Sequence, residues 1–252
     1  MRFTRRDTLG LTGAALAATL LRPHAARAEG IEVLAFDAFP IFDPRPIFAT
    51  LASIVPEGGK ALGDLWRTRQ FAYTWLRTAG GHYEDFWKVT RDALVFAAED
   101  RKVVLSAEQV DAAMDAYLGL KAWPDARGAL DALKQDGLRL CFLSNFTPRM
   151  LEAAIASAGL DGYFDKVLST DAARTFKPDP KAYRLAMDAF GLPRERILFV
   201  PFAGWDAAGA KWFGYETFWV NRLGTPPEAL GVRADGTGRT LDDLVAYLRT
   251  RA

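Results

Sequence analysis

The chain has 252 residues, of which half are hydrophobic and one quarter are charged, and its formal net charge is +1. This is the composition of an ordinary globular protein, and the length allows one large core or a core with a smaller inserted domain. The single cysteine, Cys141, excludes an intramolecular disulfide, and having only His24 and His82 disfavours a multi-histidine metal site or a Ser-His-Asp hydrolase.

The first 28 residues have the pattern of an export signal. Arg5 and Arg6 precede an apolar run from Leu9 to Leu21, and Ala26-Arg27-Ala28 supplies the small residues of a cleavage site. That run is shorter than the roughly 20 residues needed to span a bilayer. We therefore expect a twin-arginine signal peptide over residues 1–28, no stable membrane anchor after cleavage, and a periplasmic mature protein.

Cleavage of this segment changes the charge of the protein. It removes five arginines and one aspartate, so the formal net charge falls from +1 to about −3. A mildly acidic surface argues against nucleic acid or anionic lipid as a partner.

The first element after the signal is a buried strand. The run from Ile31 to Phe36 is apolar and rich in β-branched and aromatic residues, as in a parallel strand covered on both faces, and it ends at Asp37. In open α/β sheets ligands bind at the carboxyl ends of the strands, so Asp37 is the first candidate for chemistry. Pro40 and Pro44 in the following turn are expected to prevent an immediate helix.

No convincing strand follows until about residue 117, and apolar residues recur instead at three- and four-residue intervals. This spacing predicts four helices, at 47–55, 62–77, 83–98 and 106–117. Ser106 and Gln109 have the spacing of a capping box at the start of the last helix. We interpret residues 46–117 as a helical cap inserted after the first strand.

From residue 118 onward strands alternate with single helices. Strands are predicted at 138–144, 166–169, 197–200 and 217–220, and helices at 125–135, 148–158, 180–190, 205–213 and 241–251. Residues 224–239 are turn-rich and are expected to lie on the surface, whereas Cys141 lies within an apolar strand and is interpreted as core packing.

This alternation predicts the fold class. Strands separated by single helices indicate a parallel sheet with helices on its faces. The expected architecture is therefore α/β, a doubly wound parallel sheet formed by residues 29–45 and 118–252, with the helical cap inserted between these two parts.

Polar side chains follow four of the strand regions. They are Asp37, Ser144 with Asn145, Lys177 and Asp206. Taken singly, each has an ordinary explanation as a helix cap or a solvated side chain. Because the carboxyl ends of parallel strands share one edge of a sheet, we expect these groups to converge.

Four segments stand out beside these sites: 65–70 (LWRTRQ), 73–77 (YTWLR), 177–183 (KPDPKAY) and 205–214 (WDAAGAKWFG). Together with the strand-end residues they resemble the haloacid dehalogenase superfamily, and most closely its type II (S)-2-haloacid dehalogenases. The resemblance covers nearly the whole mature chain and implies the Rossmann-like core of that superfamily.

The resemblance implies covalent catalysis on short 2-haloacids, without a cofactor or metal. Asp37 would attack the halogen-bearing carbon, and water would hydrolyse the resulting ester. Lys177 would keep Asp37 ionised, and Ser144 would bind the substrate carboxylate. Asp206 would either orient or deprotonate water, or hold Lys177 in place, and the sequence does not separate these two roles.

The departing halide needs a cationic and apolar cradle rather than a proton. The resemblance places Arg67, Asn145 and Trp205 in that cradle, with Phe86 as an added apolar wall. Without the flanking motifs, Arg67 would be interpreted as a helix-surface residue and Trp205 as core packing. The resemblance also leaves a homodimer open, since many relatives are dimers.

Phosphatases of the same superfamily provide a contrasting pattern. They usually carry a second aspartate two residues after the nucleophile, which serves as general acid, and they bind magnesium. Phe39 occupies that position here, and Asp43 lies too far along the turn to replace it. A phosphate-ester hydrolase is therefore the least favoured of the enzymatic alternatives.

Two departures from the dehalogenase pattern concern the site itself. The turn after Asp37 is one residue shorter, lacks the usual Gly-Thr pair and contains Pro40, while the usual Ser-Ser-Asn of the fourth motif is Pro201-Phe202-Ala203. Both changes threaten the positioning of water for the second step. A non-catalytic or degenerate small-acid-binding homologue therefore stays open beside the dehalogenase.

Overall fold

The computed structural model describes residues 30–251, so the expected signal peptide lies outside the described residues. Its centre is a parallel sheet with the strand order β3-β2-β1-β4-β5-β6. The strands are β1 (Val33–Phe36), β2 (Arg139–Ser144), β3 (Lys166–Ser169), β4 (Ile197–Val200), β5 (Glu216–Val220) and β6 (Gly236–Gly238). The predicted doubly wound parallel sheet is confirmed.

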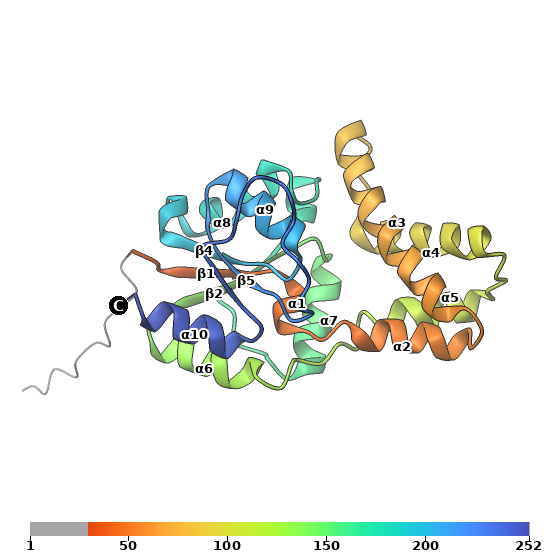
Figure 1. Cartoon of the computed structure of the whole chain (residues 1–252), viewed down its shortest axis with the longest axis horizontal. Helices are drawn as coiled ribbons and strands as arrows, with labels where there is room; N and C mark the ends of the chain where they lie inside the picture. Colours follow the sequence, from red (N-terminus) through yellow and green to blue (C-terminus); the bar gives the residue numbers. More distant parts are fainter. Residues whose placement is uncertain (1–29, 252) are drawn as a thin grey trace, which may run out of the picture.

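Helices cover both faces of this sheet (Figure 1). Those of the core are α1 (Ala38–Ile41), α6 (Ala126–Gln135), α7 (Pro148–Ala158), α8 (Pro180–Phe190), α9 (Gly204–Phe213) and α10 (Leu241–Arg249), with 3-10 turns η1 (Thr170–Ala173) and η2 (Arg194–Arg196). Helices α6, α7 and α10 bury their apolar sides in one cluster, and α8 and α9 bury theirs in a second cluster on the opposite face.

The strands supply side chains to the two clusters alternately, as the pleat of a strand requires. In β1, Leu34 and Phe36 belong to the first cluster, while Val33 and Ala35 belong to the second. Cys141 of β2 is fully buried in the second cluster, and burial raises the pKa of its thiol. Its interpretation as a packing residue is confirmed.

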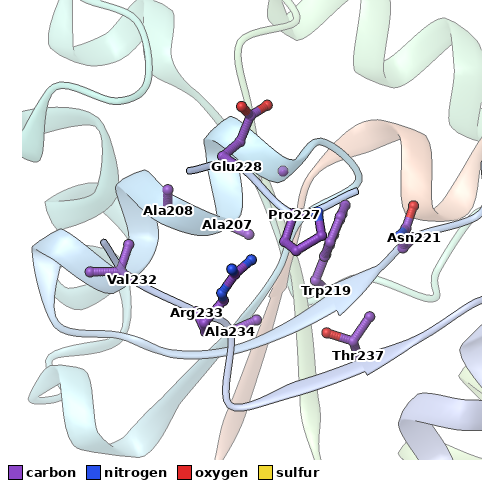
Figure 2. A pocket seen from close by; sticks show the side chains of 11 residues that line it. Ala207, Ala208, Trp219, Asn221, Pro227, Glu228, Val232, Arg233, Ala234 and Thr237 are labelled. Carbon is purple, nitrogen blue, oxygen red and sulfur yellow. The ribbon is translucent and has the colours of Figure 1, made fainter. Parts of the chain in front are cut away.

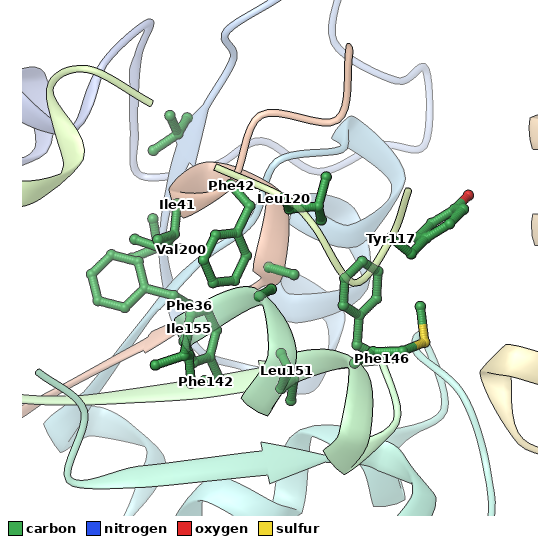
Figure 3. Packing of buried hydrophobic residues seen from close by; sticks show 14 of the residues in the cluster. Phe36, Ile41, Phe42, Tyr117, Leu120, Phe142, Phe146, Leu151, Ile155 and Val200 are labelled. Carbon is green, nitrogen blue, oxygen red and sulfur yellow. The ribbon is translucent and has the colours of Figure 1, made fainter. Parts of the chain in front are cut away.

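Aromatic and aliphatic side chains pack together in the first cluster (Figure 3). Phe42 stacks on Phe142 of β2 with 5.4 Å between ring centroids, and both are fully buried. This packing fixes the chain that leaves β1, and therefore the position of Asp37 at its start.

The expectation that prolines would prevent a helix after β1 is wrong. Helix α1 begins directly after Asp37, which is its N-cap, and Pro40 is its third residue. The first N–H groups of a helix have no intrahelical acceptor, so a proline there costs no hydrogen bond.

Four further helices lie between β1 and β2 in the sequence and pack on one another beside the sheet (Figure 1). They are α2 (Arg45–Ile54), α3 (Gly59–Gly80), α4 (Phe86–Arg101) and α5 (Ala107–Asp115), called here the insert helices. Trp66 Nε1 of α3 donates to the Thr90 carbonyl of α4 at 2.8 Å. The predicted capping box between Ser106 and Gln109 is present at the start of α5.

Strand β6 was not expected, because residues 224–239 contain turn-forming residues and little apolar pattern. Its two glycines pack where a side chain would not fit: a Cβ on Gly236 would approach the rings of Phe218 and Tyr247 to less than 3 Å. Separately, no helix within residues 30–251 combines the length and apolar character needed to cross a bilayer.

Candidate active site

A cleft of about 990 Å³ lies between the insert helices and the carboxyl edge of the sheet. Seven of the eight residues singled out from the sequence line it: Asp37, Arg67, Phe86, Ser144, Asn145, Lys177 and Trp205. The eighth, Asp206, lies behind this surface and is 1% exposed. The structure therefore brings the candidate residues together around one hollow.

The strand order explains this convergence. Strand β1 lies between β2 and β4, and Phe36 pairs with both Phe142 and Val200. The chain moves outward from β1 to β3 and then returns to the other side of β1 at β4. Asp37 consequently lies at the point where the direction of winding reverses, which is where doubly wound sheets bind ligands.

The two carboxylate oxygens of Asp37 have different surroundings. Oδ1 accepts from the Lys177 ammonium at 2.9 Å and from the Ser144 hydroxyl at 3.2 Å. Oδ2 has only a long contact, 3.5 Å, from the Phe39 N–H. One oxygen is therefore held while the other keeps its lone pairs available towards the cleft.

Lys177 connects Asp37 with Asp206. Its ammonium lies 2.9 Å from Asp37 and 2.6 Å from Asp206, and its side chain is 1% exposed. Burial alone would lower the pKa of Lys177, but the charges of Asp206 and Asp37 outweigh burial and raise the pKa above its ordinary value. The two carboxylates therefore favour the charged form of the ammonium that lies between them.

Both oxygens of Asp206 are engaged. Oδ2 accepts from Lys177 at 2.6 Å, and Oδ1 accepts from the Tyr183 hydroxyl at 2.7 Å. Burial raises the pKa of Asp206 to about 6, although the bonds from Lys177 and Tyr183 favour the ionised form. Because Asp206 does not line the cleft, the geometry favours the second of its two expected roles, that of holding Lys177.

Tyr183 is a member of this network that sequence reasoning did not assign. It is fully buried on α8, six residues after Lys177. A Cβ on Gly209 of α9 would lie 2.5 Å from the Tyr183 hydroxyl, so glycine at that position lets α9 and Asp206 approach it. Tyr183 and Gly209 both lie within the motif segments, which was the signal available.

Ser144 lines the cleft and contacts Asp37. Its hydroxyl donates to Asp37 and accepts from the Phe146 N–H at 3.3 Å. A hydroxyl has one proton, so binding a substrate carboxylate through Ser144 would require this proton to leave Asp37. Ser144 therefore first positions the carboxylate.

Asn145 presents one end of its amide to the cleft. Its side-chain oxygen accepts from the backbone N–H of Lys177 at 3.0 Å and from the Thr170 hydroxyl at 3.2 Å. Within residues 30–251 its side-chain NH₂ group donates to no protein acceptor. The two bonds to the oxygen thus direct an unpaired donor towards an anion in the cleft.

Arg67 and two aromatic side chains complete the cradle. Arg67 lies on α3, is exposed, and forms no ion pair within the described part of the chain. Trp205 at the start of α9 packs against Phe71 and Trp75 of α3, with ring centroids 5.3 and 5.6 Å apart. Phe86 at the start of α4 is 2% exposed and forms an apolar wall.

The segment between β4 and α9 forms an apolar side of the site. Phe202 packs edge-on against Phe39, with 5.7 Å between ring centroids, and both rings line the cleft. Ala203 is the N-cap of α9 and has no side-chain acceptor to offer the first turn. Phe39 thus occupies, with an apolar ring, the position where the phosphatases carry a carboxylate.

The segment after β5 forms the outer wall of the cleft. A second hollow of about 270 Å³ lies on its other side, where Trp219, Pro227 and Arg233 are among the lining residues (Figure 2). Pro227 and Glu228 line both hollows. This segment therefore separates the cleft from the surface over α9.

Residues 30–251 contain no group of three or more His, Cys, Asp or Glu side chains arranged to hold a metal ion. The cation between the two motif carboxylates is the Lys177 ammonium. A carboxylate clamped by a buried lysine, at the switch point of a doubly wound sheet and covered by helices, is the arrangement of a hydrolase with an aspartate nucleophile.

The chain belongs to the haloacid dehalogenase-like hydrolase family, whose model matches residues 23–214. It is 38% identical to haloacetate dehalogenase H-2 of Moraxella sp. (strain B), over 85% of this chain and 96% of that protein. It is 37% identical to the (S)-2-haloacid dehalogenase of Pseudomonas sp. (strain YL), over 88% of this chain and 96% of the relative.

Solved structures agree with this assignment. The fold matches the L-2-haloacid dehalogenase RSc1362 with a TM-score of 0.85 and 44% identity, over 87% of this chain and 99% of that one. It also matches the L-2-haloacid dehalogenase of Xanthobacter autotrophicus with chloropropionic acid covalently bound, with a TM-score of 0.82 and 32% identity, over 88% and 100% of the two chains.

Proposed function

We propose that this protein hydrolyses short 2-haloacids to 2-hydroxy acids through an ester on Asp37. The observation that supports this most directly is the Asp37 carboxylate, with Oδ1 held by Lys177 and Ser144 and Oδ2 left for attack. The cleft above it presents unpaired donors for an anion. Relatives that cover most of this chain are 2-haloacid dehalogenases, and one relative holds chloropropionic acid covalently.

In the first step, Asp37 Oδ2 donates an electron pair to the halogen-bearing carbon. The carbon–halogen bond breaks and its electron pair leaves with the halide, so no proton is required. Arg67 and the Asn145 NH₂ group are the donors that receive the anion, and Phe86 and Trp205 exclude water around it. Such donors stabilise charge as it develops in the transition state.

In the second step, water adds to the ester carbonyl carbon of Asp37. The bond to the alkoxy oxygen breaks, and that oxygen takes a proton and leaves as the hydroxyl of the product. Overall, one water is consumed and one halide, one proton and one 2-hydroxy acid are released. This sequence restores the Asp37 carboxylate for another turnover.

We propose that this second step is the slower one. The hydrogen bonds that reach Asp37 within the described residues come from Lys177, Ser144 and the Phe39 N–H, and none of these groups is a carboxylate or imidazole. Phe202 and Ala203 offer water no side-chain hydrogen bond. Poor positioning of a reactant by about 1 Å can cost about a hundredfold in rate.

The test is halide release over time from the purified protein with chloroacetate and racemic 2-chloropropionate, measured by ion chromatography. Sustained release that disappears in Asp37→Asn supports the proposal. Unchanged release from that variant would show that Asp37 is not the nucleophile. Phosphate release that depends on magnesium would favour the phosphate-ester alternative instead.

The size of an initial burst separates the two steps. A burst of one equivalent followed by no further release means that Asp37 is alkylated and the ester is not hydrolysed. Binding of a carboxylate without release of halide would instead indicate the non-catalytic small-acid-binding homologue, the alternative motivated by Pro201-Phe202-Ala203.

We also propose that the protein is exported through the twin-arginine pathway and acts in the periplasm. The support is the sequence of residues 1–28, with Arg5 and Arg6 before a short apolar run. A reporter fused to residues 1–28 should reach the periplasmic fraction. The same fusion with both arginines replaced by lysine should stay in the cytoplasm, and equal export of the two fusions would reject the assignment.

A homodimer formed through the insert helices is a further proposal. Leu76 and Trp75 of α3 are 65% and 40% exposed, and burying such side chains would stabilise association. Light scattering should give the mass of two chains for the parent and of one chain for Leu76→Lys, whereas a monomeric parent would refute the proposal.

A further inference from the structure

Two hydrogen bonds between the described residues join α3, α4 and their connecting loop to the core. Tyr83 donates from its hydroxyl to Asp171 Oδ1 at 2.5 Å. The Phe176 N–H donates to the Thr78 hydroxyl at 3.3 Å. Both bonds reach the core in the segment that runs from η1 to Lys177.

Packing supports the first of these bonds. The Arg174 guanidinium lies 5.1 Å from the centre of the Tyr83 ring, and the Phe176 ring lies 5.2 Å away on centroids. Burial and the bond to Asp171 raise the pKa of Tyr83 well above its ordinary value. The hydroxyl therefore remains a donor throughout the physiological range of pH.

The helices that this contact joins to the core carry groups that line the cleft. Arg67 lies eleven residues before Thr78 on the same continuous helix, a distance of about 16 Å along its axis. Phe86 begins α4 only three residues after Tyr83. A change in how the end of α3 sits on the core would thus move both Arg67 and Phe86.

We propose that Tyr83 and Asp171 are positioning residues, whose hydrogen bond holds the insert helices so that Arg67 and Phe86 face Asp37. This inference rests on the proposed dehalogenase function. Neither residue lines the cleft, so both act through the helices that they join. The bond lies between an inserted segment and the core.

The experiment compares Tyr83→Phe, Asp171→Ala and their double variant with the parent, using chloroacetate. Each single change should lower kcat/KM about tenfold, because small displacements of reacting groups are costly. Inhibition by added chloride should weaken by a similar factor, because Arg67 is displaced from the position in which it binds the halide. The double variant should match the single ones, because both changes break the same bond.

Two further variants separate positioning from general damage. Asp171→Asn keeps an oxygen that accepts the Tyr83 proton, so it should restore most of the activity lost in Asp171→Ala. Tyr73→Phe is the matched control: Tyr73 also lies on α3, but its ring packs on Phe96 and its hydroxyl bonds to no core residue between positions 118 and 251. It should leave kcat/KM and chloride inhibition unchanged.

The inference is overturned if Tyr83→Phe retains parental kcat/KM and chloride inhibition, or if the double variant loses about a hundredfold. It is also overturned if Asp171→Asn is as damaged as Asp171→Ala. Failure of the proposed function is a different result, namely no halide release from the parent. In that case amide hydrogen exchange of residues 59–101 tests whether the bond fixes α3 and α4 on the core. Faster exchange in Tyr83→Phe than in the parent supports this, and unchanged exchange rejects it.

Discussion

The two sides of the Asp37 carboxylate are built from opposite kinds of residue. On one side, Lys177, Asp206 and Tyr183 form a buried chain of hydrogen bonds with lengths of 2.6 to 2.9 Å. On the other, Phe39, Phe202 and Ala203 present apolar groups to the cleft. The polar side holds Asp37, the proposed nucleophile, and the apolar side offers no side-chain hydrogen bond to a water beside the proposed ester.

This difference suggests that the two halves of the reaction have separate structural supports. A change on the polar side should slow formation of the ester, most strongly where it removes a group that contacts Asp37. A change on the apolar side should alter how quickly the ester disappears. The variants below test this division, beginning with the largest expected effect.

Lys177→Met should lower the rate of the first step about a thousandfold, because it removes the cation that holds Asp37 and leaves the buried Asp206 without its cationic partner. The measurement is the rate of halide release in a single turnover, with enzyme in excess over substrate. Lys181→Met is the matched control, because Lys181 is an exposed lysine in the first turn of the helix that follows Lys177. An equal loss of this rate in both variants would contradict a specific role for Lys177.

Ala203→Asn should accelerate ester hydrolysis about tenfold without changing the burst, since it returns an amide to the apolar side. It should also add about 1 kcal/mol to the free energy of unfolding by capping α9. Ala203→Ser caps the helix but has no amide, so it should raise stability alone. The ester is followed over time by mass spectrometry of the intact protein. Equal rates of ester loss in the parent and in Ala203→Asn would show that this side does not limit the second step.

The activity should also fall as the pH drops through about 6, the pKa of Asp206, because a protonated Asp206 no longer balances the charge of Lys177. Tyr183→Phe removes a bond that favours the ionised form, so the acid limb of the kcat/KM profile should move upward by about one pH unit. At pH 6 this is a loss of up to about tenfold. If the acid limb of the kcat/KM profile is the same in Tyr183→Phe and in the parent, the pKa of Asp206 does not determine it.

Stability should change with pH in the opposite sense. The pKa of Asp206 rises from 3.8 to about 6 on folding, so the folded protein binds its proton more tightly than the unfolded chain. Its contribution is therefore fully present below about pH 4 and is lost as the pH rises to about 6. The difference in unfolding free energy between the parent and Asp206→Asn, measured from pH 4 to 7, isolates this group.

Much of this site could be predicted from the sequence, because simple physical rules fix it. Asp37, Ser144 and Asn145 lie at the carboxyl ends of strands, and parallel strands bring these ends together. Arg67 was found only through the family motifs, because nothing in an exposed helical arginine indicates which residue it faces. Strand β6 was missed, since close packing of its glycines against Phe218 and Tyr247 depends on tertiary contacts that have no local pattern.

The role of Asp206 could not be derived in the same way. Its distance from Lys177 and from the cleft depends on how α9 sits on α8, and that approach depends on glycine at position 209 beside Tyr183. Pro40 failed as a helix stop for a different reason. A proline in the first turn removes an N–H that has no intrahelical acceptor, so the rule that proline ends helices does not apply there.

The smallest expected effect concerns Thr170, which lies on the polar side but does not contact Asp37. Its hydroxyl donates to the Asn145 oxygen at 3.2 Å and so helps to direct the NH₂ group into the cleft. Thr170→Val keeps the shape and removes this bond, while the Lys177 N–H still holds the same oxygen at 3.0 Å. Because one of the two bonds remains, the inhibition constant for chloride should rise, and kcat should fall, by only about threefold.

Thr217→Val provides the control for this change. Thr217 is also fully buried and its hydroxyl donates to a carbonyl, that of Tyr215, at 3.2 Å, but it lies on β5 away from the cleft. Both variants lose one buried hydrogen bond, so they should lose similar stability, about 1 kcal/mol. Only Thr170→Val should change the inhibition by chloride. If both variants or neither change it, the Asn145 amide is not oriented by Thr170, and the Lys177 N–H alone must be sufficient.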